Sequence, residues 1–171
     1  MKTLHLLRHA KSDWGDPDLS DEQRPLNDRG KRDAKRLAEY LEKHPIAVDM
    51  VFCSPAKRAK QTLKAIERAL RAPVTEEQGL YGAGEEQLLK FVRRLPGKLD
   101  AVLLIGHNPG FEELARTLLP ATASPPAFPT CALASLIHLT DCIARHNRVL
   151  PSWRCYTARC NITRYSYRCR R

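Results

Sequence analysis

Three short polar segments supply the residue types that could do chemistry in this sequence. They contribute two imidazoles and two guanidiniums, from Arg8, His9, Arg58 and His107. Each segment follows one of three short apolar runs, at residues 3–7, 48–53 and 101–105. Such runs are typical of buried strands. Because the carboxyl ends of parallel strands meet at one edge of an open sheet, we expect the four side chains to converge there.

Two histidines with two arginines suit the transfer of a phosphoryl group. Guanidinium groups bind phosphate oxygens through paired hydrogen bonds, and helix N-termini expected near Ala56 and Pro109 add backbone donors. An imidazole nitrogen can attack phosphorus in line, which makes His9 the candidate nucleophile. Flanking Arg charges disfavour its imidazolium form, so His9 should stay neutral near pH 7. His107 would donate a hydrogen bond to the phosphoryl oxygens.

Apolar periodicity predicts the elements that position these residues. Apolar side chains recur three and four positions apart in four expected helices, at residues 31–43, 56–70, 85–95 and 111–119. A further strand is expected at residues 130–136, after a proline-rich connector at 120–129 that excludes a helix. Strands that alternate with helices predict an α/β fold with three layers, α/β/α, around a mostly parallel central sheet.

Length and composition indicate one globular domain without a membrane span. The chain has 171 residues, of which 43% are hydrophobic and 28% charged, as in ordinary soluble domains. Its longest apolar run, at residues 101–105, is too short to cross a bilayer. Charged residues near the N-terminus interrupt any secretory signal. We therefore expect a cytoplasmic protein with no membrane partner.

Most of the net charge of +10 belongs to the C-terminal segment. Residues 1–136 hold 21 Lys and Arg against 18 Asp and Glu, a balance of +3, whereas residues 137–171 hold eight Arg and one Asp, a balance of +7. Nucleic acid is therefore not an expected partner of the main domain. The segment 137–171 also holds four of the six cysteines, without the C-x-x-C spacing of a zinc site, so no metal is expected. We hypothesise that a different reading frame or an unrelated extension forms this Arg- and Cys-rich segment, and that residues 1–136 form the functional domain.

Three sequence blocks lie in a fixed order within that domain: LRHA at residues 7–10, SPAKRAKQT at residues 54–62 and GHNP at residues 106–109. They resemble the signature blocks of the histidine phosphatase superfamily, and most closely those of its SixA-type phosphohistidine phosphatases. The resemblance implies a phosphoglycerate mutase-like fold, no cofactor and a transient phosphoryl group on His9. It also implies that Arg8, Arg58 and His107 complete the phosphate pocket, and that Arg24, in the segment RPL, borders it and contacts phosphate or substrate.

The chain departs from the family pattern at two points. Ala10 stands where many members have glycine, a variant that occurs in the SixA-like branch. Larger members carry an acidic proton donor between the second and third blocks, but the acids of this interval lie in no matching motif. They are Glu76, Glu77, Glu85 and Glu86. The general acid stays unassigned, and a phosphoramidate such as phosphohistidine, whose leaving imidazole needs a weaker acid, is the favoured substrate.

The short interval between the second and third blocks also bears on the substrate. Only 44 residues separate Thr62 from His107, which leaves little chain for a capping insertion. We expect an open pocket that admits a side chain of another protein, such as a phosphorylated histidine phosphotransfer domain. A phosphatase of small phosphorylated metabolites and a noncatalytic phosphoprotein-binding module are the alternatives, and turnover separates the enzymes from the binding module.

Two polar residues near these blocks are interpreted as structural. His5 lies between two leucines of the first expected strand and should belong to the core. Ser54 is not flanked by the Gly-x-Ser-x-Gly pattern of a nucleophile elbow, so we expect it to be a turn and cap residue.

Overall fold

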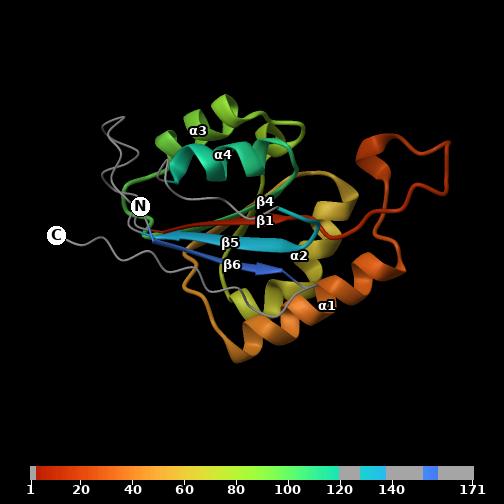
Figure 1. Cartoon of the computed structure of the whole chain (residues 1–171), viewed down its shortest axis with the longest axis horizontal. Coiled ribbons are helices and arrows are strands. Elements are labelled where there is room, and N and C mark those ends of the chain that lie inside the picture. The colour runs from red at the N-terminus through yellow and green to blue at the C-terminus, as the bar shows by residue number, and fades with distance from the viewer. Residues whose placement is uncertain (1–2, 120–127, 138–151, 158–171) are drawn as a thin grey trace.

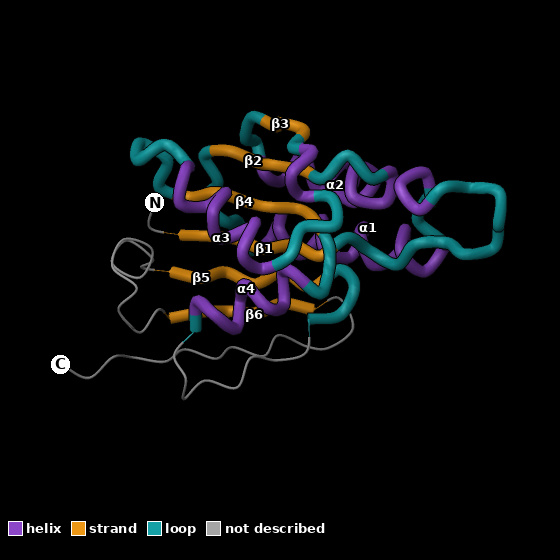
Figure 2. Tube along the Cα trace, turned by 90° about the horizontal axis from the view of Figure 1, so that it is seen from above, coloured by secondary structure: helices purple, strands orange, loops and turns teal. Residues whose placement is uncertain are grey.

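The computed structural model describes residues 3–119, 128–137 and 152–157. Within these ranges, six strands form one sheet in the order β3-β2-β4-β1-β5-β6 (Figure 2). The strands are β1 (Thr3–Arg8), β2 (Met50–Cys53), β3 (Val74–Glu76), β4 (Ala101–Gly106), β5 (Ala132–Ile137) and β6 (Ser152–Thr157). The first four run parallel, and β5 and β6 add two antiparallel pairings at one side.

Two pairs of helices cover the two faces of the sheet. The helices α1 (Asp28–Lys43) and α2 (Lys57–Leu70) lie on one face, and α3 (Glu85–Arg94) and α4 (Gly110–Leu118) lie on the other (Figure 1). Two short 3-10 helices, η1 (Asp21–Gln23) and η2 (Gln78–Leu80), lie in the connections. The arrangement confirms the expected three-layer α/β/α fold, and each expected helix has bounds within three residues of those observed.

Successive side chains of the central strands point to opposite faces of the sheet and belong to two separate apolar cores. Leu4 and Leu6 of β1 pack with residues of α3 and α4, whereas Leu7 packs with residues of α1 and α2. The residues of β4 are divided between the two cores in the same way. Both strands are therefore buried on both faces, as helices on two sides of a sheet require. No helix in the described part of the chain is long and apolar enough to cross a membrane.

Two strands were not expected from the sequence. The strand β3 has three residues, all exposed, and so carries no apolar alternation. The strand β6 lies within residues 137–171 and pairs antiparallel with the whole length of β5. Most of the proline-rich connector and most of the segment after Ile137 lie outside the described residues. The division of the chain at residue 136 therefore stays a prediction.

The connection between β1 and α1 extends beyond the carboxyl ends of the parallel strands (Figure 1). Its base is closed by an antiparallel bridge between Ser12 and Leu26 and by a hydrogen bond of 2.8 Å from the Asp13 N–H to the Pro25 carbonyl oxygen. The helix α1 begins after Asn27, whose side chain caps it. This connection therefore stands at the edge of the sheet where the candidate residues are expected.

Candidate active site

The carboxyl ends of β1, β2 and β4 meet at one edge of the sheet. The register of β1 on β4 pairs Arg8 with Gly106. Beyond the strands, the backbone N–H of His9 donates to the Gly106 carbonyl oxygen at 3.0 Å. The backbone N–H of Ser54 donates to the Ile105 carbonyl oxygen at 2.9 Å. The three loops that carry the candidate residues therefore begin side by side.

Arg58 brings the two candidate histidines together. Its Nε donates to His9 Nε2 at 3.3 Å, and its Nη2 lies 3.4 Å from His107 Nδ1. The centroids of the two imidazole rings are 5.0 Å apart, and all three side chains are buried. Thr62 holds this arrangement, because its Oγ1 accepts from the Ala10 N–H at 3.0 Å and donates to the Arg58 carbonyl oxygen at 2.7 Å. An oxyanion between the two rings would contact both imidazoles and the guanidinium.

One hydrogen bond decides which nitrogen of His9 can act as a nucleophile. His9 Nδ1 lies 2.7 Å from the Ala10 carbonyl oxygen, which can only accept, so Nδ1 carries the hydrogen. The lone pair is then on Nε2, on the side of Arg58. Burial is the main reason that the pKa of His9 falls to about 3, and the charges of Arg58 and Arg8 act in the same direction. His9 is therefore neutral near pH 7, with burial contributing more than the flanking charges.

Ser54 orients the second histidine. Its Oγ lies 2.8 Å from His107 Nε2 and also accepts from the Ala56 N–H at 3.4 Å. Ser54 thus lies in the connection between β2 and α2, but the expectation that it caps the helix was wrong, because Ala56 is the N-cap of α2 and has no side-chain cap. Its contact with His107 was not indicated by its place in the sequence. Burial and the charge of Arg58 lower the pKa of His107 to about 4. Because a hydroxyl both donates and accepts, Ser54 supports either neutral tautomer of His107.

Arg8 ties the site to the segment that precedes β5. Its Nη1 donates to the Phe128 carbonyl oxygen at 2.7 Å, and Asn108 Nδ2 donates to the same oxygen at 3.0 Å. The backbone N–H of Cys131 lies 3.1 Å from the carbonyl oxygens of both Arg8 and His9. Arg8 Nε is buried without a hydrogen-bond partner among the described residues. This nitrogen is a donor that a bound oxyanion would satisfy.

Asp21, which sequence reasoning missed, adds a carboxylate to the cluster. Its Oδ2 lies 2.7 Å from Arg58 Nη2 and accepts from the Tyr81 hydroxyl at 2.9 Å, and its backbone carbonyl accepts from Arg58 Nη1. Burial raises the pKa of Asp21, but the hydrogen bonds from Arg58 and Tyr81 outweigh it and hold the pKa below its ordinary value. Asp21 is therefore a counter-ion near pH 7 and not a proton donor.

Arg24 reaches the site through Asp21. Its Nη1 lies 2.6 Å from Asp21 Oδ1, while its Nε and Nη2 donate to the Asp13 carbonyl oxygen and to Ser12 Oγ, each at 2.8 Å. Its Cζ lies 3.1 Å from the centroid of the Trp14 ring. All three nitrogens of Arg24 are thus held by the connection between β1 and α1. A direct contact of Arg24 with phosphate stays a prediction.

The glutamates of the interval between the second and third blocks make other contacts. Glu76 pairs with Lys60 at 3.3 Å, and Glu86 pairs with Lys90 at 2.8 Å. Glu77 caps η2. None of these contacts involves His9 or His107, so the general acid stays unassigned. In the described ranges, no group of three or more His, Cys, Asp or Glu is placed to hold a metal ion.

Comparison with known proteins shows the family to which the chain belongs. The family model of the histidine phosphatase superfamily (branch 1) matches residues 4–106, which is more than half of the chain. The chain therefore belongs to the histidine phosphatase superfamily. The match contains the first two sequence blocks and ends at the first residue of the third.

Individual relatives point to the SixA type. The chain is 31% identical over 140 residues to the phosphohistidine phosphatase SixA of Escherichia coli, covering 78% of this chain and 83% of that protein. It is 34% identical over 138 residues to an uncharacterized protein of Mycobacterium tuberculosis, covering 76% and 85%. The solved structure of a candidate SixA from Agrobacterium tumefaciens matches with a TM-score of 0.74 at 30% identity, covering 80% and 91%. These likenesses confirm the SixA-type resemblance and the phosphoglycerate mutase-like fold, and they support phosphatase activity.

Proposed function

We propose that this protein is a phosphatase that removes the phosphoryl group from phosphohistidine in another protein, through a covalent intermediate on His9. One observation carries the proposal: His9 keeps its hydrogen on Nδ1, bonded to the Ala10 carbonyl oxygen, and turns the Nε2 lone pair toward the Arg58 guanidinium, with the His107 ring 5.0 Å from its own. Similarity to the phosphohistidine phosphatase SixA of Escherichia coli and to the candidate SixA of Agrobacterium tumefaciens favours phosphohistidine over other phosphorylated groups.

The first half-reaction transfers the phosphoryl group to His9. Nε2 of His9 attacks phosphorus, and the substrate N–P bond breaks with its electron pair returning to the substrate imidazole. A substrate ring protonated on its other nitrogen leaves as a neutral imidazole, so no strong protein acid is needed. Arg58, Arg8 Nε and His107 hydrogen-bond the equatorial oxygens as their negative charge shifts.

The second half-reaction releases phosphate. Water attacks phosphorus on the opposite side from His9, and the N–P electron pair returns to Nε2. Nδ1 still carries its own hydrogen, which is bonded to the Ala10 carbonyl oxygen, so His9 leaves as a neutral imidazole. The proton lost by water goes to the phosphate and the solvent. Residues of this chain carry every step, so we propose that the reaction requires no metal ion.

Turnover of a phosphorylated histidine phosphotransfer domain in the presence of EDTA tests the proposal. We expect phosphate release by the wild type and none by His9→Ala, with an acid-labile, alkali-stable phosphoenzyme in the wild type alone. His44→Ala, which removes an exposed histidine at the end of α1, is the matched control and should retain full turnover.

Four outcomes would overturn parts of the proposal. Sugar phosphates turned over orders of magnitude faster would overturn the substrate. Retention of the phosphoprotein without release would make the protein a binding module. Activity in His9→Ala would show that His9 is not the nucleophile. Loss of wild-type turnover in EDTA would show that the reaction needs a metal ion.

A further inference from the structure

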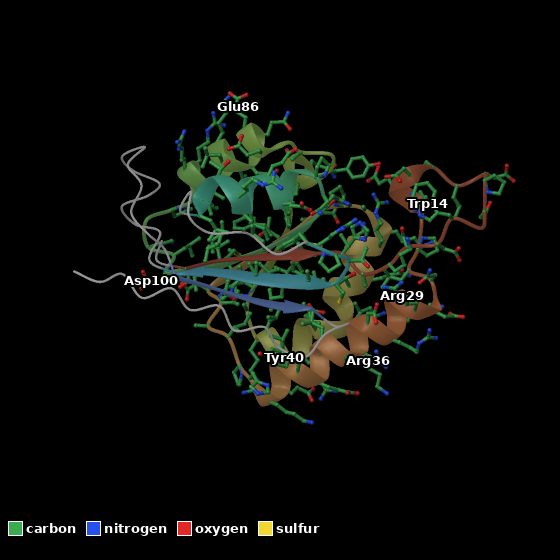
Figure 3. The ribbon with its side chains drawn as sticks, in the orientation of Figure 1. Trp14, Arg29, Arg36, Tyr40, Glu86 and Asp100 are labelled. Carbon is green, nitrogen blue, oxygen red and sulfur yellow. The ribbon has the colours of Figure 1, made fainter. Side chains whose placement is uncertain are left out.

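Two exposed aromatic side chains, those of Trp14 and Tyr81, lie next to residues that contact the candidate site. Among the described residues, three large hydrophobic side chains are exposed: Trp14 (73%), Val74 (39%) and Tyr81 (37%). Trp14 lies on the connection between β1 and α1 (Figure 3), and Tyr81 packs edge-on against His107 with ring centroids 5.6 Å apart. Exposed Trp and Tyr side chains are the residues that contribute most to protein interfaces.

Both aromatic rings are held in place although they are exposed. The Trp14 ring stacks on the Arg24 guanidinium, and the nitrogens of Arg24 are in turn fixed by the surrounding loop. The Tyr81 hydroxyl donates to Asp21. A partner that packs on these rings therefore does not have to order them, which reduces the entropic cost of binding.

The segment around Trp14 is strongly acidic. Residues 13–22, which we call the acidic loop, contain five carboxylates and no Lys or Arg. The carboxylates are Asp13, Asp16, Asp18, Asp21 and Glu22. The first four are exposed, whereas the guanidinium of Arg58, which pairs with Asp21, is buried. The buried guanidinium of the site suits a phosphoryl group. The acidic and aromatic side chains around it would instead face the protein that carries this group.

We propose that the acidic loop and Tyr81 form the docking surface for a protein whose phosphohistidine is flanked by basic and apolar side chains. The inference rests on the proposed function. The path from His9 to Trp14 passes through Arg58, Asp21 and Arg24 in turn. Three side chains thus separate His9 from the indole along this path, so we expect the flanking residues of a protein substrate to contact the indole and a small phosphoramidate at His9 not to. The carboxylates attract a basic flank and repel nucleic acid.

Two phosphohistidine peptides of equal length test the charge and apolar preference. One has Lys and Leu beside the phosphohistidine, and the other has Glu and Ala at the same positions. We expect the KM of the Lys-Leu peptide to be at least tenfold lower, with the difference shrinking as salt is added. Replacing Asp16 and Asp18 by Asn should weaken this salt dependence, whereas the paired changes Glu39→Gln and Glu42→Gln on α1 should not. Equal KM values for the two peptides would overturn the proposal.

The aromatic contribution is measured as a selectivity ratio, which is kcat/KM for the Lys-Leu peptide divided by kcat/KM for free phosphoramidate. We expect Trp14→Ala to lower this ratio at least tenfold and Trp14→Phe, which keeps an aromatic ring, to lower it less. Val74→Ala removes an exposed apolar side chain from β3 and should leave the ratio as in the wild type. Circular dichroism checks that each variant is folded.

The outcomes separate this inference from the proposed function. If the wild type hydrolyses neither peptide nor phosphoramidate, the proposed function fails. If the wild type hydrolyses both peptides and Trp14→Ala has the same selectivity ratio, only the docking surface is refuted.

Discussion

At the scale of single residues, Arg58 has a counter-ion that bears on the proposed binding of phosphate. Asp21 holds Arg58 Nη2 at 2.7 Å, while the backbone of Asp21 holds Nη1. The fork that a phosphoryl group would use is thus already occupied by a carboxylate and a carbonyl. A bound phosphoryl group must compete with the charge of Asp21, whose side chain is half exposed.

We expect Asp21→Asn to bind phosphate more tightly. The change removes a negative charge beside the guanidinium of Arg58, which we propose binds phosphate, but keeps an oxygen that can accept from Tyr81. An ion pair at this exposure is worth up to about 1 kcal/mol, so the inhibition constant of inorganic phosphate should fall about fivefold. Asp28→Asn, an exposed change at the start of α1, should leave the constant unchanged. A constant that rises instead would mean that Asp21 mainly positions Arg58.

The convergence of His9, Arg58 and His107 could be predicted, because each follows a buried strand or opens the helix after one. Asp21 and Tyr81 could not be predicted, since they lie in or directly after short 3-10 turns that have no apolar period. The same limit applies to Ser54, whose hydrogen bond to His107 depends on how two loops face each other. Motifs indicated the candidate site residues, but only the fold showed which residues contact and orient them.

At the scale of elements, α1 closely approaches the loop after β1, which carries the proposed nucleophile His9. A Cβ on Gly30, in the first turn of α1, would lie 2.1 Å from the Lys11 carbonyl oxygen. That oxygen also accepts from the Asn27 N–H at 3.0 Å. Lys11 directly follows Ala10, whose carbonyl fixes the tautomer of His9. Because Gly30 has no side chain, the start of α1 can pack closely against the chain next to His9.

We expect Gly30→Ala to destabilise the fold. The added methyl group meets backbone that cannot rotate away, and overpacking of this kind costs about 1–3 kcal/mol of unfolding free energy. Gly97→Ala is the control, because a Cβ there has nothing within 4 Å, and it should change the stability by less than about 0.5 kcal/mol. Urea denaturation measures both. Equal stability of the two variants would show that α1 can shift away from the loop at no cost.

Periodicity predicted the four long helices and the buried strands because their apolar faces pack on a core. It could not predict β3, whose three residues are all exposed. In the same way, nothing in the composition of the Arg- and Cys-rich segment indicated that β6 would pair with β5. Burial leaves a pattern in the sequence, whereas pairing by backbone hydrogen bonds at a sheet edge leaves almost none.

At the scale of the whole molecule, buried histidines make stability depend on pH. Burial lowers the pKa of His5 to about 4, of His9 to about 3 and of His107 to about 4. In an unfolded chain, the pKa of histidine is about 6.5. Above pH 6.5 both states are neutral, and no stability is lost. As the pH falls below 6.5, the unfolded state takes up protons that the folded state does not, so stability decreases until the folded pKa values are reached.

His5 provides the cleanest test, because it lies in the core, as predicted, and away from catalysis. Its ring bridges Ser135 Oγ at 2.8 Å and the Ala47 carbonyl oxygen at 3.0 Å. Between pH 7 and pH 5, the unfolding free energy of the wild type should fall by roughly 2 kcal/mol more than that of His5→Gln. Urea denaturation at both pH values measures this difference. The exposed change His44→Gln should behave as the wild type, and an identical pH response in His5→Gln would contradict the assignment.

The place of β1 in the sheet has a consequence for synthesis. Thr3 pairs with Ala101 on one side and with Ile137 on the other, so both neighbours of the strand are translated long after it. Until they arrive, Leu4 and Leu6 lack the core residues that they pack against, and the backbone groups of the strand lack their native partners. The nascent chain therefore contains an apolar, unpaired strand until β4 and β5 have been translated. We therefore expect that slower elongation before β4 prolongs the exposure of this strand and lowers the native yield.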